Sequence, residues 1–191
     1  MNVFMVVDPD KCIGCRTCEV ACVVAHSAKD AILTGQLENS FFPRLKVIKT
    51  AEVSVPVQCR HCEDAPCANV CPVKAIVNTH DTIQVNSAVC IGCKNCILAC
   101  PFGVMDLVPR VVDGERILQS RLKVVESGEV IAKDYLEAVK CDLCIDRPGG
   151  PACAEVCLNK AFILVKEQDI TARKKEKRIK SASELLHLTS K

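Results

Sequence analysis

The sequence predicts an α+β fold in which one small unit is nested inside another and a C-terminal helix follows. Three observations lead to this prediction. Sixteen of the 191 residues are cysteines, their spacing repeats along the chain, and short apolar runs typical of strands flank the repeats. Aromatic residues make up only 3% of the chain and tryptophan is absent. A conventional hydrophobic core would be poor, so groups bound by the cysteines are expected to organise the fold.

The cysteines form four groups of four, with none left over. Two groups share the spacing C-x2-C-x2-C-x3-C, namely Cys12, Cys15, Cys18, Cys22 and Cys90, Cys93, Cys96, Cys100. The second and fourth groups widen the middle gap and consist of Cys59, Cys62, Cys67, Cys71 and Cys141, Cys144, Cys153, Cys157. This spacing is typical of [4Fe–4S] ligands.

Two other uses of cysteine compete with iron–sulfur binding. Disulfides need an export route, and the segment from Met1 to Lys11 lacks a basic region, a small-residue cleavage site and a twin-arginine pair. Zinc sites pair two C-x2-C knuckles across a longer gap and do not need three closely spaced cysteines. Iron–sulfur clusters are therefore favoured over disulfides and over a zinc-bound structural adaptor.

The spacing also predicts how each group binds. Three cysteines in a tight loop surround one cubane, and the fourth, expected at the start of a short helix, ligates a neighbouring cluster, as in two-cluster ferredoxins. Gly14 and Gly92 follow the first ligand closely, where a loop against a cluster leaves no room for a side chain. Pro72 and Pro101 follow the fourth cysteine of their groups and suit a first helical position.

The groups can pair in sequence order, or the middle two can form an inner unit that the outer two enclose. The chain from Cys59 to Cys90 is compact, with a turn near His80-Asp81 and a strand from Thr82 to Val85, whereas the flanking gaps are longer. We therefore predict nesting. The predicted ligand sets are Cys12, Cys15, Cys18 and Cys157; Cys22, Cys141, Cys144 and Cys153; Cys59, Cys62, Cys67 and Cys100; and Cys71, Cys90, Cys93 and Cys96. Four [4Fe–4S] clusters would then lie in a row.

The predicted organisation is two ferredoxin-like (double-cubane) units with insertions. The outer unit comprises residues 1–52 and 109–165, the inner unit residues 53–108, and a C-terminal arm residues 166–191. The apolar runs Val3–Val7 and Phe162–Val165 are predicted strands of the outer unit. A further strand, Val53–Val57, is predicted to enter the inner unit.

Two insertions are either partner-contact surfaces or plain surface loops. Residues 23–52 carry the pair Phe41-Phe42. Residues 109–140 are predicted to contain a hairpin turn at Asp113-Gly114 and a short helix from Ala132 to Val139.

The histidines and two phenylalanines are expected to contact a cluster, to shield it or to lie at the surface. His61, between two ligands, is expected to hydrogen-bond a cluster sulfur and tune its potential. Phe102 and Phe162 are expected to shield clusters, and the surface histidines are expected to be His26, His80 and His187.

The C-terminal segment lacks cysteine and differs in composition. Seven Lys and Arg residues face three acids between Lys166 and Lys180, and apolar residues recur at helical spacing, namely Ile179, Ala182, Leu185, Leu186 and Leu188. This pattern predicts a basic amphipathic helix. It is either an arm that docks another subunit, possibly a second copy of this chain, or a helix folded on its own domain or left in solvent.

Charge and hydropathy say little about partners. The formal charge of +2 becomes about −6 if each cluster with its thiolates adds about −2, and nothing argues for nucleic acid. No stretch is long and apolar enough to suggest a membrane span. We expect a cytoplasmic protein, in which thiols stay reduced.

The motifs resemble a known family. K-C-I-G-C-R-T-C-E-V-A-C (11–22), C-R-H-C-E-D-A-P-C-A-N-V-C-P (59–72), C-I-G-C-K-N-C-I-L-A-C-P-F-G (90–103), K-C-D-L-C (140–144) and G-P-A-C (150–153) resemble the four-cluster iron–sulfur subunits of the molybdopterin oxidoreductase families. The resemblance is strongest to members found in formate hydrogenlyase and hydrogen-dependent carbon dioxide reductases, and it covers residues 1 to about 165. Val23 and Leu158 stand where proline often follows the fourth cysteine, so helices there are expected to differ.

The resemblance implies a non-catalytic electron-transfer subunit. Its partners would be a molybdopterin formate dehydrogenase catalytic subunit, containing molybdenum or tungsten, and a hydrogenase subunit, with a second polyferredoxin subunit as a further candidate. The cluster on Cys12, Cys15, Cys18 and Cys157 would face the pterin enzyme. Two alternatives stay open, a free polyferredoxin serving several oxidoreductases and an accessory protein for metalloenzyme maturation.

Overall fold

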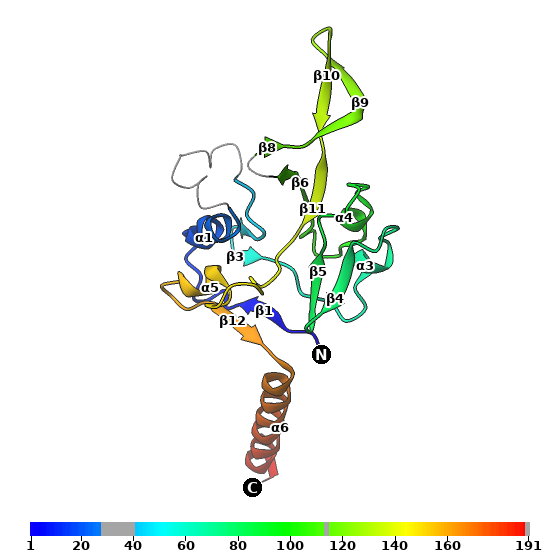
Figure 1. The fold of residues 1–191 in the computed structure, drawn as a ribbon. Coiled ribbons are helices and arrows are strands. Elements are labelled where there is room, and N and C mark those ends of the chain that lie inside the picture. Colours follow the sequence, from blue (N-terminus) through cyan, green and yellow to red (C-terminus); the bar gives the residue numbers. More distant parts are fainter. Residues whose placement is uncertain (28–40, 113–114, 190–191) are drawn as a thin grey trace.

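The computed structural model describes residues 1–27, 41–112 and 115–189. Two small α+β units lie side by side, a long hairpin extends from one of them, and a single helix extends from the other (Figure 1). Every strand in the described part of the chain pairs with one antiparallel partner, so the sheets are all two-stranded. Such ribbons are only marginally stable by themselves, which fits the expectation that bound groups organise the fold.

One unit brings the two ends of the cysteine-rich region together. β1 (Phe4–Val7) pairs with β12 (Phe162–Val165), with Phe4 opposite Val165 and Val7 opposite Phe162. α1 (Thr17–His26) and α5 (Ala152–Glu155) pack against each other. The two predicted apolar strands are thus confirmed, and they join the first and fourth cysteine groups.

The other unit contains the middle groups. β4 (Ile76–Thr79) and β5 (Thr82–Val85) form a hairpin, and α3 (Pro66–Asn69) packs on α4 (Asn95–Ala99). The predicted turn is present, since His80 and Asp81 both have positive φ, at 50° and 55°. Two consecutive residues with positive φ match the twist of a tight hairpin.

The segment after the middle groups is mostly strand. β6 (Asp106–Pro109) pairs with β11 (Leu136–Val139), β7 (Val111–Val112) pairs with β8 (Glu115–Arg116), and β9 (Leu118–Glu126) pairs with β10 (Glu129–Asp134). The predicted helix from Ala132 to Val139 is wrong, because backbone pairing with β9 and β6 overrides the helix propensity of its Ala, Lys, Leu and Glu residues. The predicted turn at Asp113-Gly114 lies outside the described residues.

The strand predicted at Val53–Val57 is present as β3 (Ser54–Val57), but its predicted assignment to the inner unit is wrong. It pairs with β2 (Lys46–Lys49), and Val47 of β2 packs in the core of the outer unit with Met5 and Leu45. A short apolar strand before a cysteine group does not reveal its partner, which here is the preceding insertion.

No fourth cysteine starts a helix, so that prediction is also wrong. Three of the four follow a short helix, and Cys22 lies within α1. α4 ends at Ala99, immediately before Cys100, and Pro72 and Pro101 lie in turns. Proline cannot continue a helix because it lacks the N–H group and clashes with the preceding turn. In the first group Val23 takes the place of this proline, and α1 continues past Cys22 for another turn, to His26. In the fourth group Leu158 takes its place, yet α5 ends at Glu155, so the absence of proline permits a longer helix without requiring one.

The buried residues form two core clusters, one centred in each unit, and Cys59 of the inner unit packs in the cluster of the outer unit. In the outer unit the buried core cluster is Met5, Cys18, Cys22, Leu45, Val47, Cys59, Cys141, Leu143 and Cys153. In the inner unit it is Ala65, Ala75, Ile76, Ile83, Cys90, Cys96, Met105 and Ala138. Cysteines are five of the nine residues of the first cluster and two of the eight of the second, and neither cluster contains an aromatic residue.

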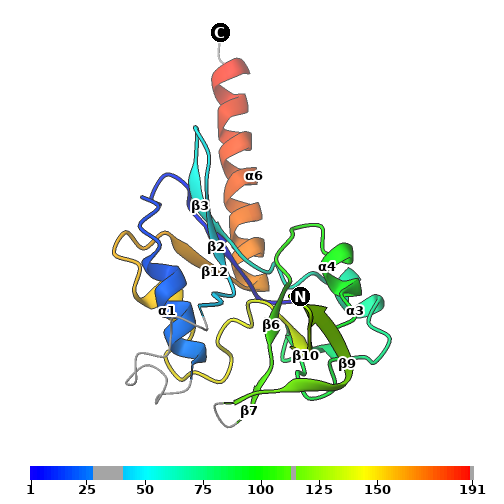
Figure 2. The same cartoon turned by 90° about the horizontal axis from the view of Figure 1, so that it is seen from above.

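The predicted C-terminal helix is α6 (Glu167–Thr189), which projects away from both units (Figure 2). Ile179 and Leu185 are exposed on it, and the amino terminus of Met1 lies 3.5 Å from Glu167 at its first turn. The side chains of Leu186, His187 and Leu188 lie outside the described residues. Among the helices that the structure describes, none is both long and apolar enough to cross a membrane.

Candidate iron–sulfur sites

Four cavities of the described chain are each lined by four cysteines. The lining sets are Cys12, Cys15, Cys18 and Cys157; Cys22, Cys141, Cys144 and Cys153; Cys59, Cys62, Cys67 and Cys100; and Cys71, Cys90, Cys93 and Cys96. All sixteen cysteines are free thiols. In each set, three sulfurs come from one group and the fourth comes from the last cysteine of another group.

The donor chemistry of these cavities fits an iron–sulfur cubane. Four cysteine sulfurs in one cavity are the ligands that such a cluster requires. Backbone N–H groups also point at the sulfurs, and the donors are Arg44 to Cys22 at 3.3 Å, His61 to Cys59 at 3.4 Å, Ala75 to Cys71 at 3.2 Å, Ala138 to Cys90 at 3.4 Å and Ala161 to Cys157 at 3.3 Å. An N–H group that donates to a thiolate stabilises its negative charge.

Burial raises the pKa of several of these thiols and so disfavours the thiolate form unless a cationic group lies beside it. It raises the pKa of Cys18 and Cys96 to about 11 and that of Cys141 to about 12. For Cys153, burial and then the neighbouring cysteines raise the pKa further. Thiolates crowded in this way need a positively charged core, and metal binding would release their protons.

The two motif glycines leave no room for a side chain, as predicted. The atoms that a Cβ would meet belong to the protein itself. Gly92 has φ +64°, and a Cβ there would lie 2.4 Å from the backbone oxygen of Leu136 in β11. Gly14 has φ +68°, and a Cβ there would lie 2.3 Å from Ser54 Oγ in β3. A strand therefore packs directly on the ligand loop in each unit.

Two of the four cavities reach the surface through a ligand. Cys15 and Cys93 are the only exposed cysteines of the sixteen, and they line different cavities, one in each unit. Exposed apolar side chains accompany both of them, Ile13 and the 93%-exposed Leu158 near Cys15, and Ile91 near Cys93. The other two cavities contain no exposed cysteine.

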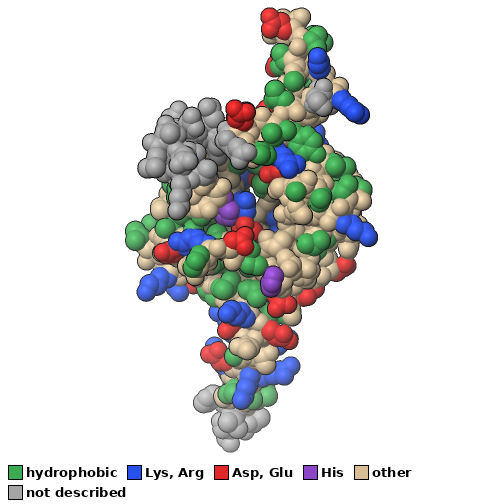
Figure 3. Space-filling view, viewed as in Figure 1, with side chains coloured by type: hydrophobic (Ala, Val, Ile, Leu, Met, Phe, Trp, Pro, Cys, Tyr) green, Lys and Arg blue, Asp and Glu red, His purple; other side chains and the backbone are tan. Residues whose placement is uncertain are grey.

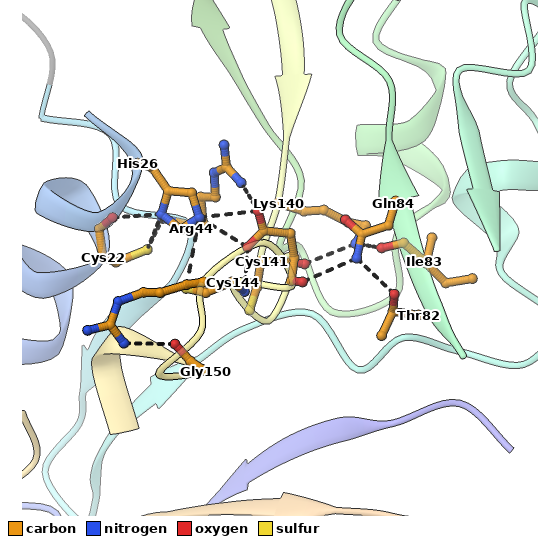
Figure 4. Close-up of polar contacts among 12 residues, drawn as sticks. Cys22, His26, Arg44, Thr82, Ile83, Gln84, Lys140, Cys141, Cys144 and Gly150 are labelled. Carbon is orange, nitrogen blue, oxygen red and sulfur yellow. Dashed lines mark hydrogen bonds and ion pairs between the residues drawn. The ribbon is translucent and has the colours of Figure 1, made fainter. Parts of the chain in front are cut away.

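His26 is not the surface residue that the sequence suggested. The extra turn of α1 places its Nδ1 2.7 Å from the Cys22 carbonyl oxygen, and its Nε2 lies 3.1 Å from Asp142 Oδ1 (Figure 4). Burial lowers the pKa of His26, but hydrogen bonds to Asp142, Cys144 and Cys22 outweigh it and raise the pKa to about 12. The ring is therefore an imidazolium, which donates from both nitrogens.

Asp142 is the centre of this polar group. It also forms an ion pair with Arg44 and accepts a hydrogen bond from the Cys144 N–H at 2.9 Å. Burial works against the charged form, but His26 and then Arg44 hold the pKa of Asp142 well below its ordinary range. The sequence offered one clue that was not used, namely that Asp142 and Lys140 flank the ligand Cys141.

His61 is fully buried but does not line a cysteine cavity. Its Nδ1 accepts a hydrogen bond from the Ile83 N–H at 3.0 Å, and its Nε2 has no partner among the described residues. Burial, and then the Lys140 charge, lower the pKa of His61 to about 3. The contact of His61 with a ligand is through its backbone N–H, which donates to Cys59 Sγ.

Of the remaining residues singled out in the sequence, some line the cysteine cavities and others lie at the surface. Phe102 lines the Cys59 cavity and Phe162 lines the Cys12 cavity, as expected for cluster shields. His80 is exposed, and the exposed pair Phe41 and Phe42 precedes β2.

A polar cleft separates the two units. Its lining includes Arg44, Gln84, Lys140 and Asp142, and in the space-filling view the surface is hollowed between the units, with charged and histidine side chains at the hollow (Figure 3). Gln84 Nε2 donates to the Asp142 carbonyl oxygen at 3.2 Å. The junction between the units is thus polar, whereas both cores are apolar.

Comparisons with known proteins agree with this chemistry. Residues 51–112 match the 4Fe-4S dicluster domain family, and residues 4–27 match a 4Fe-4S binding domain family. The chain is 44% identical to electron transport protein HydN of Escherichia coli over 184 residues, which cover 95% of this chain and 98% of HydN. It is 38% identical to hydrogenase-4 component A (96% and 92% covered) and 37% identical to formate hydrogenlyase subunit 2 (93% and 89% covered), both from the same species.

Proposed function

This chain belongs to the family of ferredoxin-type [4Fe–4S] electron-transport proteins that includes HydN, and from that premise we propose that it holds four [4Fe–4S] clusters and passes single electrons between a molybdenum or tungsten formate dehydrogenase and a hydrogenase. It does so without a catalytic site of its own, as a cytoplasmic subunit. Two relatives are a hydrogenase component and a formate hydrogenlyase subunit by name, which supports hydrogen and formate metabolism as the setting.

The observation that carries the proposal is the match between cavities and cysteines. Each of the four cavities has four cysteine sulfurs in its lining, so sixteen ligands suffice for four cubanes with none left over. The crossing of Cys22 and Cys157 within the outer unit, and of Cys71 and Cys100 within the inner unit, supports the nested double-ferredoxin arrangement. A cluster bound in such a cavity accepts and donates one electron at a time.

The protein's contribution is to hold, shield and connect these sites. Core packing places Cys59 of the inner pair with Cys22 and Cys141 of the outer pair, which supports a row in which these two sites are central. The sites with exposed Cys15 and Cys93 are then the ends of the row, where a partner can approach a ligand closely. We propose that the Cys15 end faces the formate dehydrogenase and the Cys93 end faces the hydrogenase side, directly or through a second polyferredoxin subunit.

α6 is proposed as the arm that docks a neighbouring subunit or a second copy of this chain. It is exposed from Thr171 to Leu185 and carries exposed Ile179 and Leu185, which would be buried in such a complex. Deleting residues 170–191 and measuring assembly size by light scattering tests this role. An unchanged assembly would contradict it.

Anaerobic purification of the complex is the main test. We expect about sixteen iron atoms per chain, co-purification in fixed stoichiometry with subunits that contain molybdenum or tungsten and with a hydrogenase, and reduction of the clusters by formate and by hydrogen. A colourless chain that contains zinc would exclude electron transfer. A loaded chain that purifies without partners would indicate a free carrier or an accessory protein.

A further inference from the structure

Lys140 is a buried cation at the junction between the two units. It follows β11, its side chain is only 3% exposed, and its Nζ donates hydrogen bonds to the carbonyl oxygens of Ile83 and, at 3.0 Å, of Cys141 (Figure 4). Ile83 lines the cavity that contains Cys59, and Cys141 lines the cavity that contains Cys22. The ammonium group therefore lies between one cysteine cavity of the inner unit and one of the outer unit.

No carboxylate of the described residues lies within ion-pair distance of Lys140. The neighbouring cation Arg44 is paired with Asp142, so its charge is offset, whereas two carbonyl dipoles only solvate the Lys140 charge. A buried ammonium without a counter-ion is costly, by several kcal/mol in real proteins. Its presence here indicates that something anionic compensates it.

The thiolates of the two flanking cavities are the available anions. Burial raises the pKa of Cys62, Cys67 and Cys141, and the Lys140 charge opposes that rise at all three. These cysteines belong to the two cavities that Lys140 bridges. A cubane with four thiolates carries about −2 of charge, and one-electron reduction takes it to about −3.

Resting on the proposed function, we propose that Lys140 is a positioning residue for electron transfer, whose fixed charge raises the reduction potentials of the two central clusters, one in each unit. The charge favours the more negative, reduced state of any cluster next to it, because charges interact strongly in a poorly solvated interior. The same side chain hydrogen-bonds both units, so it also holds the distance across which the electron must pass. The two end sites, which contain Cys15 and Cys93, receive much less of this effect.

The test is a redox titration of the full, cluster-loaded chain, followed by electron paramagnetic resonance with dithionite as reductant. Lys140→Gln keeps a hydrogen-bonding group but removes the charge. Two of the four potentials are expected to fall, each by at least a tenfold decrease in the equilibrium constant for reduction, which for one electron is 59 mV. The potentials of the other two clusters are expected to fall by less than half of this amount. Lys140→Arg keeps the charge and is expected to leave all four potentials unchanged.

Lys11 provides a matched control, because it precedes Cys12 as Lys140 precedes Cys141. Its side chain is exposed and lies 3.4 Å from Asp8, so solvent screens its charge, and Lys11→Gln is expected to leave all four potentials unchanged. If the Lys140→Gln chain does not bind its clusters, Gln84→Glu is the second variant, because it adds a negative charge in the same cleft with Lys140 in place. The same two reduction potentials should then fall.

Unchanged potentials in Lys140→Gln, an equal shift of all four, or an equal shift in Lys140→Arg would overturn the proposal. A structural crosslink alone predicts faster cluster loss with unchanged potentials. Failure of the proposed function is seen separately, as a wild-type chain with fewer than four clusters by iron analysis, before any variant is compared.

Discussion

Replacing Gly92 by alanine tests whether the ligand loops are fixed by the strands that pack on them. The positive φ of +64° costs a residue with a Cβ about 1–2 kcal/mol. The new Cβ would also lie 2.4 Å from the Leu136 oxygen, and because that oxygen belongs to the backbone of β11, relief requires the loop or the strand to move. Overpacking of this kind costs about 1–3 kcal/mol, so the total is about 2–5 kcal/mol.

Gly103 is the matched control, since its φ is +61° and nothing lies within 4 Å of a Cβ built there. Gly103→Ala therefore carries the backbone strain alone, and the difference between the two variants isolates the contact with β11. At Gly14 the obstacle is the Ser54 side chain, so Ser54→Ala should relieve part of the cost of Gly14→Ala. No such second substitution is available for Gly92.

The assay is the rate at which the loaded chain loses its cluster absorbance on anaerobic heating, because cluster loss is irreversible and stability is then a rate. A destabilisation of 1.4 kcal/mol corresponds to a factor of ten. We expect Gly103→Ala to lose clusters about 5- to 30-fold faster than the native chain, and Gly92→Ala to lose them at least another fivefold faster. Equal rates for the two variants would refute the contact argument.

Three further substitutions test individual contacts. Val23→Pro should end α1 near Cys22 and remove His26 from Asp142, at a cost of about 3 kcal/mol; iron analysis should still give the native content, because Cys22 is kept, and a loss of iron would contradict the assigned role of Val23. Tyr135→Phe removes the 2.8 Å hydrogen bond from the hydroxyl to the Cys90 carbonyl oxygen but keeps the ring beside Arg110, so we expect a loss of about 1 kcal/mol, seen as a fall of about 2–4 °C in the thermal midpoint. Asp142→Asn leaves His26 and Arg44 without their carboxylate, and breaking such a half-buried pair should cost about 3 kcal/mol; urea unfolding with a midpoint equal to that of the native chain would show that the pair is not stabilising.

The parts of the fold that depend on local spacing could be predicted from the sequence. The cysteine spacing led to four sets of four, and the cavities are lined by the same sets. The apolar runs Val3–Val7 and Phe162–Val165 predict strands because nearly every residue in them is apolar, and the structure has strands at Phe4–Val7 and Phe162–Val165. The strands need only the properties of neighbouring residues, and the pairing of the cysteine groups follows from the lengths of the gaps between them.

Features that depend on distant contacts could not be predicted. A lysine in a sequence indicates surface, and Lys140 is buried only because β5 and the fourth cysteine group close over it. His26 is predicted at the surface because the sequence does not show that α1 continues past Val23, and the extra turn brings its ring to Asp142. The segment Ala132–Val139 has helical propensity but forms strands, since its pairing partners lie far away in the sequence.

The two units repeat each other in backbone detail, and this repetition shows where they differ. Arg16 and Lys94 have positive φ before α1 and α4, and Lys74 and Lys160 have positive φ after Cys71 and Cys157. The N–H groups of Ala75 and Ala161 donate to those same two cysteines, four residues back in each case. The backbone around the proposed cluster ligands is thus duplicated, as expected if both units satisfy the same ligand geometry.

The charged residues of the junction are not duplicated. The inner unit has Pro101 where the outer unit has Val23, and of the short helices only α1 extends past its fourth cysteine and places a histidine beside it. His26, Arg44, Asp142 and Lys140 all lie beside the cavity of Cys22 and Cys141 or at its border with the inner unit. Since identical ligand sets alone would give the clusters similar potentials, differences between them must arise from such unshared charges and from solvent exposure. The junction is therefore where substitutions should change the energetics of electron transfer while leaving the binding of iron intact.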